Sequence, residues 1–214
     1  MRERPILFSD PMVRAILDGT KTQTRRVVKH KIIGPNPPTG IFDWHHPRTD
    51  EWMGAHGGGI KFGLTNAARL CPYGQPGDRL WVREAWRTSP DANAIPPRDL
   101  HDSCVITYEA DDGAIAGWGK YRPGMFMPRW ASRITLEIVG VRVERLQDIS
   151  DSDAFAEGVE KTSYGCHKHA PGGHGCMTGR DGYRELWESI NGPGSWDANP
   201  FVWVVEFKRI EVPA

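Results

Sequence analysis

The stretch RITLEIVGVRVERL, residues 133–146, carries the longest strand pattern in the chain. Ile134, Leu136 and Ile138 alternate with polar residues, and the apolar parity then changes at Val139–Gly140. A change of phase by one residue beside a glycine is typical of a β-bulge, which bends the strand that contains it. We therefore expect a long bent strand, as the wall of a small closed barrel requires.

Three other stretches have strand patterns. In GDRLWVREAW, residues 77–86, Leu80 and Val82 alternate with polar or amphipathic residues after a Gly-Asp turn. CVITYEADDG, residues 104–113, predicts a short strand that ends in a turn. FVWVVEFKRIEV, residues 201–212, predicts a final strand near the end of the chain.

Helix signals lie on both sides of these strands. Asp10-Pro11 predicts a helix start, with Asp10 as the capping residue, and Gly19 predicts the end of that helix. Ser150 is placed as the N-cap of a second helix that should stop near Gly158. DGYRELWESING, residues 181–192, has apolar residues at helical spacing and a terminal glycine.

The order of these elements decides the fold class. A helix, several strands, two helices and a final strand do not make the alternating strand–helix units of a parallel sheet. We expect an α+β fold, a mostly antiparallel β-barrel with short helices at its rim. The 214 residues suit a single domain, residues 1–214, with long irregular insertions at about 33–77, 89–128 and 161–179.

Composition limits the function classes. Lys plus Arg and Asp plus Glu each number 27, so the net charge is zero and any nucleic-acid binding must come from a local patch. Four cysteines and no apolar leader predict free thiols in a reducing cytoplasm. No apolar run approaches the roughly 20 residues that span a bilayer, so no membrane partner is expected.

The local basic patch is GTKTQTRRVVKHK, residues 19–31. Lys21 lies among hydroxyls and beside Arg25 and Arg26, and both like charge and burial lower the pKa of a lysine. Such a lysine can take a proton from water or from a hydroxyl, for which Thr24 is suitably placed. The alternative is a solvated basic turn that only caps the preceding helix.

Several motifs together resemble the ASCH family, whose β-barrel is similar to the PUA fold of RNA-modifying enzymes. The basic patch contains Gly19-x-Lys21-x-x-x-x-Arg26, and the PGDRLWVRE strand, the DAFAEG helix and the FVWVVEFKRI strand follow in the family's order. The resemblance covers half to two-thirds of the chain. The long Gly-, Pro- and Trp-rich insertions are similar in style to those of phage and prophage members.

One branch of this family hydrolyses N4-acetylcytidine. The resemblance implies that Lys21 acts as base or steadies the oxyanion, Thr24 attacks or orients water, and Glu157 passes a proton to the leaving amine. It also implies that Arg26 binds a ribose, phosphate or carbonyl oxygen. The alternative for Glu157 is a carboxylate in the N-terminal half of a helix, held there by the helix dipole.

Arginine and tryptophan also alternate outside the basic patch, in LWVREAW and PRWASR. Such pairs can grip phosphate and stack a base, or they can form cation–π pairs that bind no ligand. The candidate ligand-binding residues are Gly19, Thr22, Arg25, Arg26, Trp81, Arg83, Glu84, Arg129, Trp130 and Arg133.

The segment GCHKHAPGGHGC, residues 165–176, is rich in zinc-competent side chains. Cys166, His169, His174 and Cys176 are the candidate ligands, although their spacing matches no common zinc finger. A glycine-rich loop over the pocket is the alternative, and no other cofactor is expected.

Three functions remain open at this point. The first is a hydrolase for an acylated cytidine or a related amide, and the second is a non-catalytic module that binds RNA or a modified base. The third is a phage accessory protein that retains only the fold. The neutral charge favours a nucleoside-sized ligand over long RNA.

Overall fold

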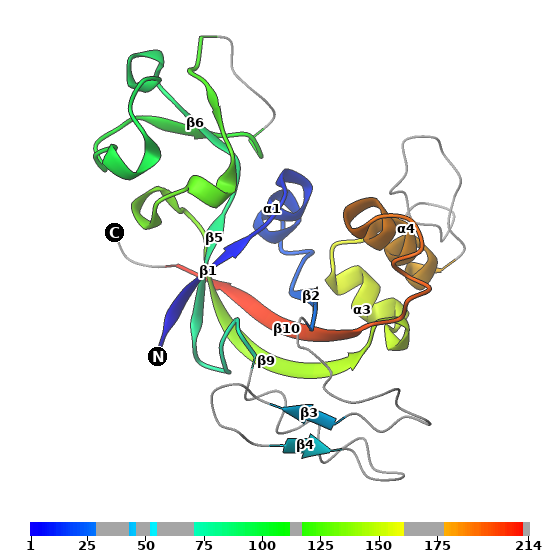
Figure 1. The fold of residues 1–214 in the computed structure, drawn as a ribbon. Coiled ribbons are helices and arrows are strands. Elements are labelled where there is room, and N and C mark those ends of the chain that lie inside the picture. The colour runs from blue at the N-terminus through cyan, green and yellow to red at the C-terminus, as the bar shows by residue number, and fades with distance from the viewer. Residues whose placement is uncertain (29–42, 46–51, 55–70, 112–116, 161–177, 212–214) are drawn as a thin grey trace.

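The computed structural model describes residues 1–28, 43–45, 52–54, 71–111, 117–160 and 178–211. They form an α+β fold around a five-stranded, mostly antiparallel sheet, in the order β1-β5-β9-β10-β2 (Figure 1). The strands of this sheet are β1 (Glu3–Leu7), β2 (Gln23–Val27), β5 (Arg79–Arg83), β9 (Thr135–Arg145) and β10 (Phe201–Ile210).

The two longest strands, β9 and β10, pair antiparallel along their length and curve together across the molecule (Figure 1). Their register shifts once, because Glu206 pairs with Gly140 whereas Phe207 pairs with Ile138. Val139 is therefore the extra residue of a β-bulge, and its side chain is 49% exposed. The bulge predicted from the parity change is confirmed.

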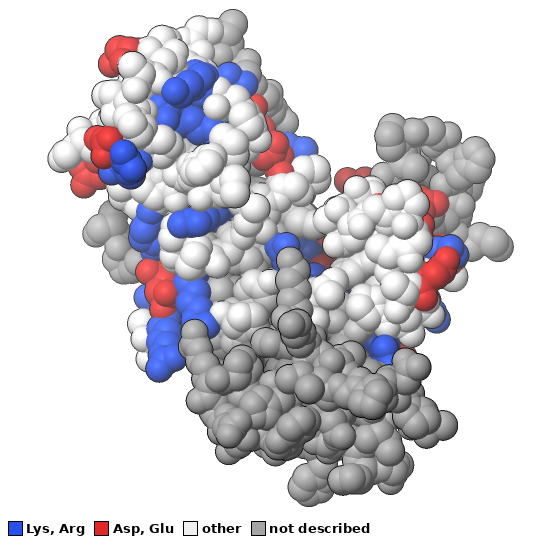
Figure 2. All heavy atoms as spheres, viewed as in Figure 1, with Lys and Arg blue, Asp and Glu red and all other residues white. Residues whose placement is uncertain are grey.

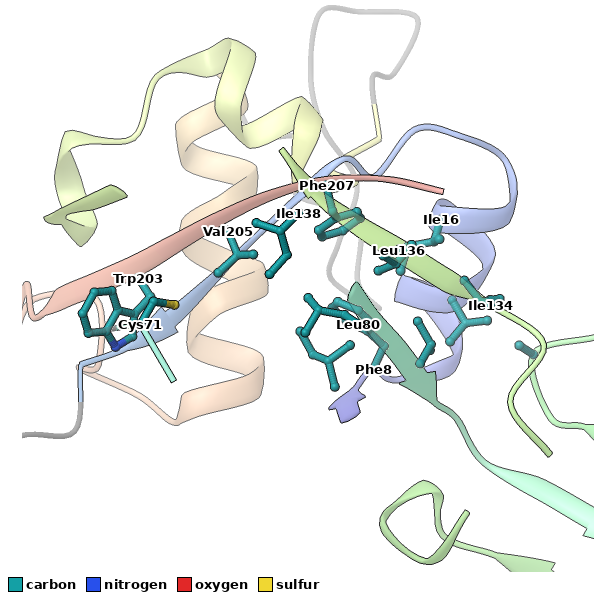
Figure 3. Close-up of a cluster of buried hydrophobic side chains, with 14 of the residues drawn as sticks. Phe8, Ile16, Cys71, Leu80, Ile134, Leu136, Ile138, Trp203, Val205 and Phe207 are labelled. Atoms are coloured by element: carbon teal, nitrogen blue, oxygen red, sulfur yellow. The ribbon is translucent and has the colours of Figure 1, made fainter. Parts of the chain in front are cut away.

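The bulge keeps one apolar core on one side of β9. Leu136 and Ile138 precede it and Val143 follows it with the opposite parity, yet all three belong to the same buried cluster. That cluster also contains Leu80 of β5 and Trp203 of β10. Figure 3 shows Leu80, Leu136, Ile138 and Trp203 in this cluster, with Cys71 beside Trp203 at one end.

Helices cover both faces of β10. Val13 and Ile16 of α1 (Asp10–Leu17) pack into the cluster that contains Trp203. On the opposite face, Val202 and Val204 pack with α3 (Asp151–Ala156) and α4 (Gly179–Asn191) in a second buried cluster.

The sheet is open in the described part of the chain. β1 pairs only with β5, in parallel, and β2 pairs only with β10, so these two strands lie at the edges. No pairing between described strands joins β1 to β2. The expected α+β class with mostly antiparallel pairing is confirmed, whereas a closed barrel is not found among these strands.

The helix caps follow the sequence with one correction. Ser9, not Asp10, is the N-cap of α1, and its side chain makes no capping hydrogen bond. The Ser150 hydroxyl accepts from the Asp153 amide at the start of α3, as predicted. α4 begins earlier than expected, because Thr178 caps it and accepts from the Asp181 amide.

The segment 89–128 is more regular than an irregular insertion. It joins β6 (Trp86–Thr88) in a three-stranded antiparallel sheet of order β7-β6-β8. Trp86, Leu100 and Met127 form the centre of its own buried cluster. The other elements of this lobe are β7 (Ile106–Tyr108), β8 (Tyr121–Arg122), η1 (Pro90–Ala92), η2 (Pro97–Asp99), η3 (Gly124–Phe126) and η4 (Arg129–Ala131).

Two smaller features complete the description. β3 (Asp43–His45) and β4 (Trp52–Gly54) pair antiparallel within the 33–77 segment, and η5 (Leu146–Asp148) follows β9. Almost all of the 161–179 segment lies outside the described residues. None of the described helices combines the length and the apolar character that crossing a membrane demands.

Candidate functional site

Lys21 lies in the short connection between α1 and β2. Gly19 has φ of +76°, a backbone conformation that glycine adopts without a steric penalty, and it turns the chain at the end of α1. The amides of Thr20 and Lys21 then both donate to the carbonyl oxygen of Ala15, each at 2.9 Å. This turn directs the chain from the last turn of α1 toward α3.

Lys21 meets Glu157, which is 136 positions away in the sequence. The Lys21 Nζ donates to Glu157 Oε2 and to the Glu157 carbonyl oxygen, both at 2.8 Å. The two side chains are 0% and 4% exposed. The two backbones also form a single antiparallel bridge. The structure therefore brings together the predicted amine and the predicted carboxylate as a buried ion pair.

Glu157 lies at the C-cap of α3, immediately before Gly158. The alternative interpretation, a carboxylate held by a helix dipole in the N-terminal half, is wrong because the C-terminal end of a dipole is negative. Gly158 has φ of +87°, and a Cβ there would lie 3.1 Å from the Ala15 Cβ. The glycine thus ends α3, as predicted, and lets it approach α1 closely.

Arg25 contacts Glu157 from the opposite side to Lys21. Its Nη1 lies 3.2 Å from Glu157 Oε1, and its Nη2 lies 2.5 Å from Glu144 Oε1 and 3.2 Å from Asp153 Oδ2. The Arg25 side chain is 0% exposed. One guanidinium therefore joins three carboxylates from β9 and α3.

The ionic network continues from Arg25 toward the surface. Arg142 Nε donates to Glu144 Oε2 at 2.9 Å, and Arg142 Nη2 lies 3.2 Å from Asp153 Oδ2. Arg142 also pairs with Glu206 of β10. Gln23 Nε2 donates to the Asp153 carbonyl oxygen at 2.7 Å and so fixes the end of α3 to β2.

Burial and charge shift the pKa values of this network. Burial lowers the pKa of the Lys21 ammonium, and Arg26 and Arg25 add to that effect, while the Glu157 carboxylate opposes it. Burial raises the pKa of Tyr183, which faces the network from α4, well above its usual value. The direction of this shift in the Lys21 pKa was predicted from the sequence, from the like charges of the basic patch and from burial.

Thr24 and Arg26 lie on the other face of β2 from Arg25. Thr24 is 2% exposed and pairs with Val205 of the Trp203 cluster. Arg26 Nη2 donates to the Leu7 carbonyl oxygen at 2.6 Å, and its guanidinium lies 5.4 Å from the centre of the Phe8 ring.

The Phe8 ring links this face to the buried ion pair, because the Lys21 Nζ lies 5.8 Å from its centre. Thr22 is exposed, and its amide donates to the Ala156 carbonyl oxygen at 2.8 Å. Lys and Arg atoms reach the surface in the hollow between the β6 lobe and the α3–α4 helices (Figure 2).

The Trp81 group is not brought to the ion pair. Trp81 and Arg83 lie on the face of β5 opposite to Leu80, and the Arg83 guanidinium stacks over the Trp81 ring at 4.6 Å. Arg129 lies 5.8 Å from the same ring and pairs with Glu3 at 2.9 Å. Of the two interpretations of the alternating arginines and tryptophans, this arrangement matches cation–π pairing and not ligand binding. The Trp81 residue is covered by arginines and is only 8% exposed.

Glu84 is buried and forms a second ionic cluster with Arg133, whose side chain is 26% exposed. Arg133 makes two hydrogen bonds to Glu84, at 3.1 and 2.9 Å, and two to Asp111, at 2.7 and 2.8 Å. Its guanidinium also lies 3.9 Å from the centre of the Tyr108 ring. Burial raises the pKa of Glu84, although Arg133 opposes this, and burial raises the pKa of Tyr108 to about 12. Trp130 packs edge-on against Trp86, 6.4 Å away.

A groove of about 330 Å³ lies on the three-stranded lobe. Of the predicted ligand-binding residues it contains only Arg83. The clustered prolines and methionines of residues 96–98 and 125–128 are the sequence signal for this groove, and sequence reasoning missed it. The lining residues are Arg83, Pro96, Pro97, Arg98, Met125, Phe126, Met127 and Pro128.

Metal ligands are not found in the described part of the chain, where no three His, Cys, Asp or Glu side chains gather in a geometry for an ion. The four zinc candidates, Cys166, His169, His174 and Cys176, lie outside the described residues. The two described cysteines, Cys71 and Cys104, are free thiols.

Comparison with known proteins adds no identity: no family model, no curated protein and no solved structure matches this chain. Functional inference therefore depends on the geometry of the chain's own residues, above all on the buried network around Lys21, Glu157 and Arg25.

Proposed function

We propose that this protein is an amidohydrolase that removes the acyl group from an N4-acylated, cytidine-like substrate. The observation that supports it is the ion pair of Lys21 and Glu157, at 2.8 Å and almost fully buried. Buried titratable groups whose pKa is shifted, as that of Lys21 is, are concentrated at functional sites, although structural networks also contain them. Membership of the ASCH family and a complete PUA-like barrel are part of the same proposal.

The proposed reaction uses three side chains. Neutral Lys21 takes a proton from the Thr24 hydroxyl, or from a water that Thr24 orients, and the oxygen attacks the acyl carbonyl carbon. The bond from that carbon to the amine nitrogen then breaks, and the proton passes from Lys21 through Glu157 to the departing nitrogen. When water is the nucleophile, the carboxylic acid is released at this point. When Thr24 is the nucleophile, a water that gives its proton to Lys21 next attacks the acyl-threonine ester, the carboxylic acid is released and the Thr24 hydroxyl regains its proton.

Arg26 is the candidate for the substrate's ribose or carbonyl oxygen. Its guanidinium lies over Phe8, as the Lys21 ammonium does, and no described carboxylate pairs with it. An arginine without a carboxylate partner retains donors for an incoming oxygen. Arg25, in contrast, is occupied by three carboxylates and is not proposed to touch substrate.

A turnover screen tests the proposal. N4-acetylcytidine, other N4-acylcytidines and acetylated RNA fragments are incubated with the protein, and the deacylated product is measured by chromatography with mass spectrometry. Lys21→Met and Glu157→Gln should each lower kcat/KM by about 100-fold or more. Lys208→Ala is the matched control, because Lys208 pairs with Glu137 at 3.3 Å with its side chain 58% exposed. Absence of turnover by the unmodified protein contradicts the proposal.

A non-catalytic binding module for RNA or a modified base is the second candidate. The groove of about 330 Å³ favours it, because that groove has two arginines on an apolar surface and includes none of the three reactive side chains. Salt-sensitive RNA binding without turnover would support this module. If neither turnover nor binding occurs, an accessory protein that retains only the fold is the remaining candidate.

A further inference from the structure

We propose that Arg25 is a positioning residue that holds the Glu157 carboxylate between two cations and so sets the pH at which the Lys21 amine can act as a base. This inference deepens the proposed function and rests on it for the catalytic consequence. Its electrostatic part concerns the folded protein alone, and it can be measured without any substrate.

The geometry divides the Glu157 carboxylate between its two partners. Oε2 accepts from Lys21 at 2.8 Å, and Oε1 accepts from Arg25 at 3.2 Å. Neither oxygen can move without losing one cation, so the carboxylate has a single orientation. Arg25 is fixed in turn, because Glu144 and Asp153 hold its other terminal nitrogen at 2.5 and 3.2 Å.

An arginine at this place has an electrostatic consequence that a neutral residue would not have. The guanidinium stays protonated in proteins, even when it is buried. Of the two cations on Glu157, Lys21 is therefore the one that can lose its proton. Because Glu157 is shared with Arg25, it stabilises the Lys21 ammonium less than it would alone, and the neutral amine becomes accessible at a lower pH.

The remaining charges around Lys21 come from every packed element. Arg26 of β2 adds positive charge, and Tyr183 of α4 faces the same network with its pKa raised by burial. Among the described residues, the charged and titratable groups of this network are Lys21, Arg25 and Arg26 from the first loop and β2, Arg142 and Glu144 from β9, Asp153 and Glu157 from α3, Tyr183 from α4 and Glu206 from β10.

The test compares two substitutions of opposite expected sign. Arg25→Gln removes the competing cation, so the Lys21 pKa should rise by about one pH unit. Glu144→Gln removes a carboxylate that occupies Arg25, so the Lys21 pKa should fall. Arg87→Gln is the matched control, since Arg87 is a half-buried arginine that pairs with Glu109 in the other sheet; it should change nothing.

The primary measurement is an NMR titration of the Lys21 side chain in protein with 13C-labelled lysine, assigned by Lys21→Arg. The second is the pH dependence of kcat/KM on N4-acetylcytidine, whose acidic limb should move to higher pH in Arg25→Gln and to lower pH in Glu144→Gln. A purely structural role would lower the plateau without moving the limb. Circular dichroism establishes which variants fold.

The outcomes separate the two proposals. If the unmodified protein shows no turnover, the proposed function fails, while the NMR titration still decides the role of Arg25. A shift within about 0.3 pH unit in Arg25→Gln, or shifts of the same sign in both variants, overturns the inference. If Arg25→Gln does not fold, Glu144→Gln decides alone, and a rise or no change in the Lys21 pKa overturns it.

Discussion

Glu157→Gln should destabilise the protein at neutral pH by about 3–5 kcal/mol, as expected when one partner of a buried ion pair is removed. Lys21 has no exposed side-chain surface, and Glu157 is the carboxylate that it contacts. After the substitution, the Lys21 ammonium has only neutral acceptors at residue 157, the backbone carbonyl oxygen and the side-chain amide oxygen, and no negative charge to compensate its own there. A buried ammonium without a carboxylate is strongly disfavoured.

Deprotonation of Lys21 limits this cost and gives it a pH dependence. Releasing the proton at pH 7 from a group with an ordinary pKa of about 10.4 costs about 4.6 kcal/mol, at 1.36 kcal/mol per pH unit. The unfolded chain then binds one proton more than the folded one, so the free energy of unfolding rises with pH. Over the pH range in which Lys21 of the unmodified protein keeps its proton, the deficit of Glu157→Gln should therefore shrink by up to about 1.4 kcal/mol per pH unit.

Urea denaturation followed by circular dichroism, at pH values from 7 to 10, measures this deficit. Lys21→Met is the comparison, because Glu157 keeps Arg25 at 3.2 Å and the new side chain does not titrate. The double variant Lys21→Met, Glu157→Gln should be more stable than Glu157→Gln alone. A deficit below about 1 kcal/mol at pH 7, or one that does not change with pH, refutes the reasoning.

Two further predictions concern the approach of α3 to α1 and the packing of β9 in the core. Gly158→Ala should cost about 1–3 kcal/mol and lower the Tm, because φ is +87° and the new Cβ would lie 3.1 Å from Ala15. Gly194→Ala, with φ of +77° and no atom within 4 Å, should cost less, and an equal loss would contradict the close-approach argument. Leu136→Ala in the fully buried part of β9 should cost about 2–5 kcal/mol in urea denaturation, whereas Val139→Ala on the same strand, at 49% exposure, should cost about 0.5 kcal/mol or less. Equal costs at these two positions would contradict the burial of Leu136 and the exposure of Val139.

The sequence was sufficient where a local signal determines structure. The parity change at Val139–Gly140 located the bulge, and Ser150 and Gly158 marked the two ends of α3. Each of these depends on residues within a few positions of one another. The closed barrel was a prediction without such a local signal, because closure depends on strand pairing between distant segments. The described strands leave β1 and β2 at open edges.

The buried ionic network shows why part of the site was missed. β2 faces α3 with Gln23 and Arg25, so its buried side has no apolar pattern that would predict a strand. Arg25 was expected to bind a ligand, but its partners are carboxylates 119 to 132 positions away. From the sequence alone, a buried arginine such as Arg25 cannot be distinguished from an arginine in a solvated turn. The structure distinguishes them because it places the distant acidic residues beside Arg25.

The position of β10 has a consequence for how the chain folds. This late segment lies between β9 and β2, and so it joins a strand near the start of the polypeptide to the rest of the sheet. During synthesis, about 175 further residues must be added after β2 before its partner strand begins, because Val27 pairs with Val202. The carboxylates that pair with Arg25 are also made long after it. Such long-range pairing slows folding and favours help from chaperones. A chain that lacks its last dozen residues should lose most of β10, and β2 would then have no neighbouring strand to connect it to β9.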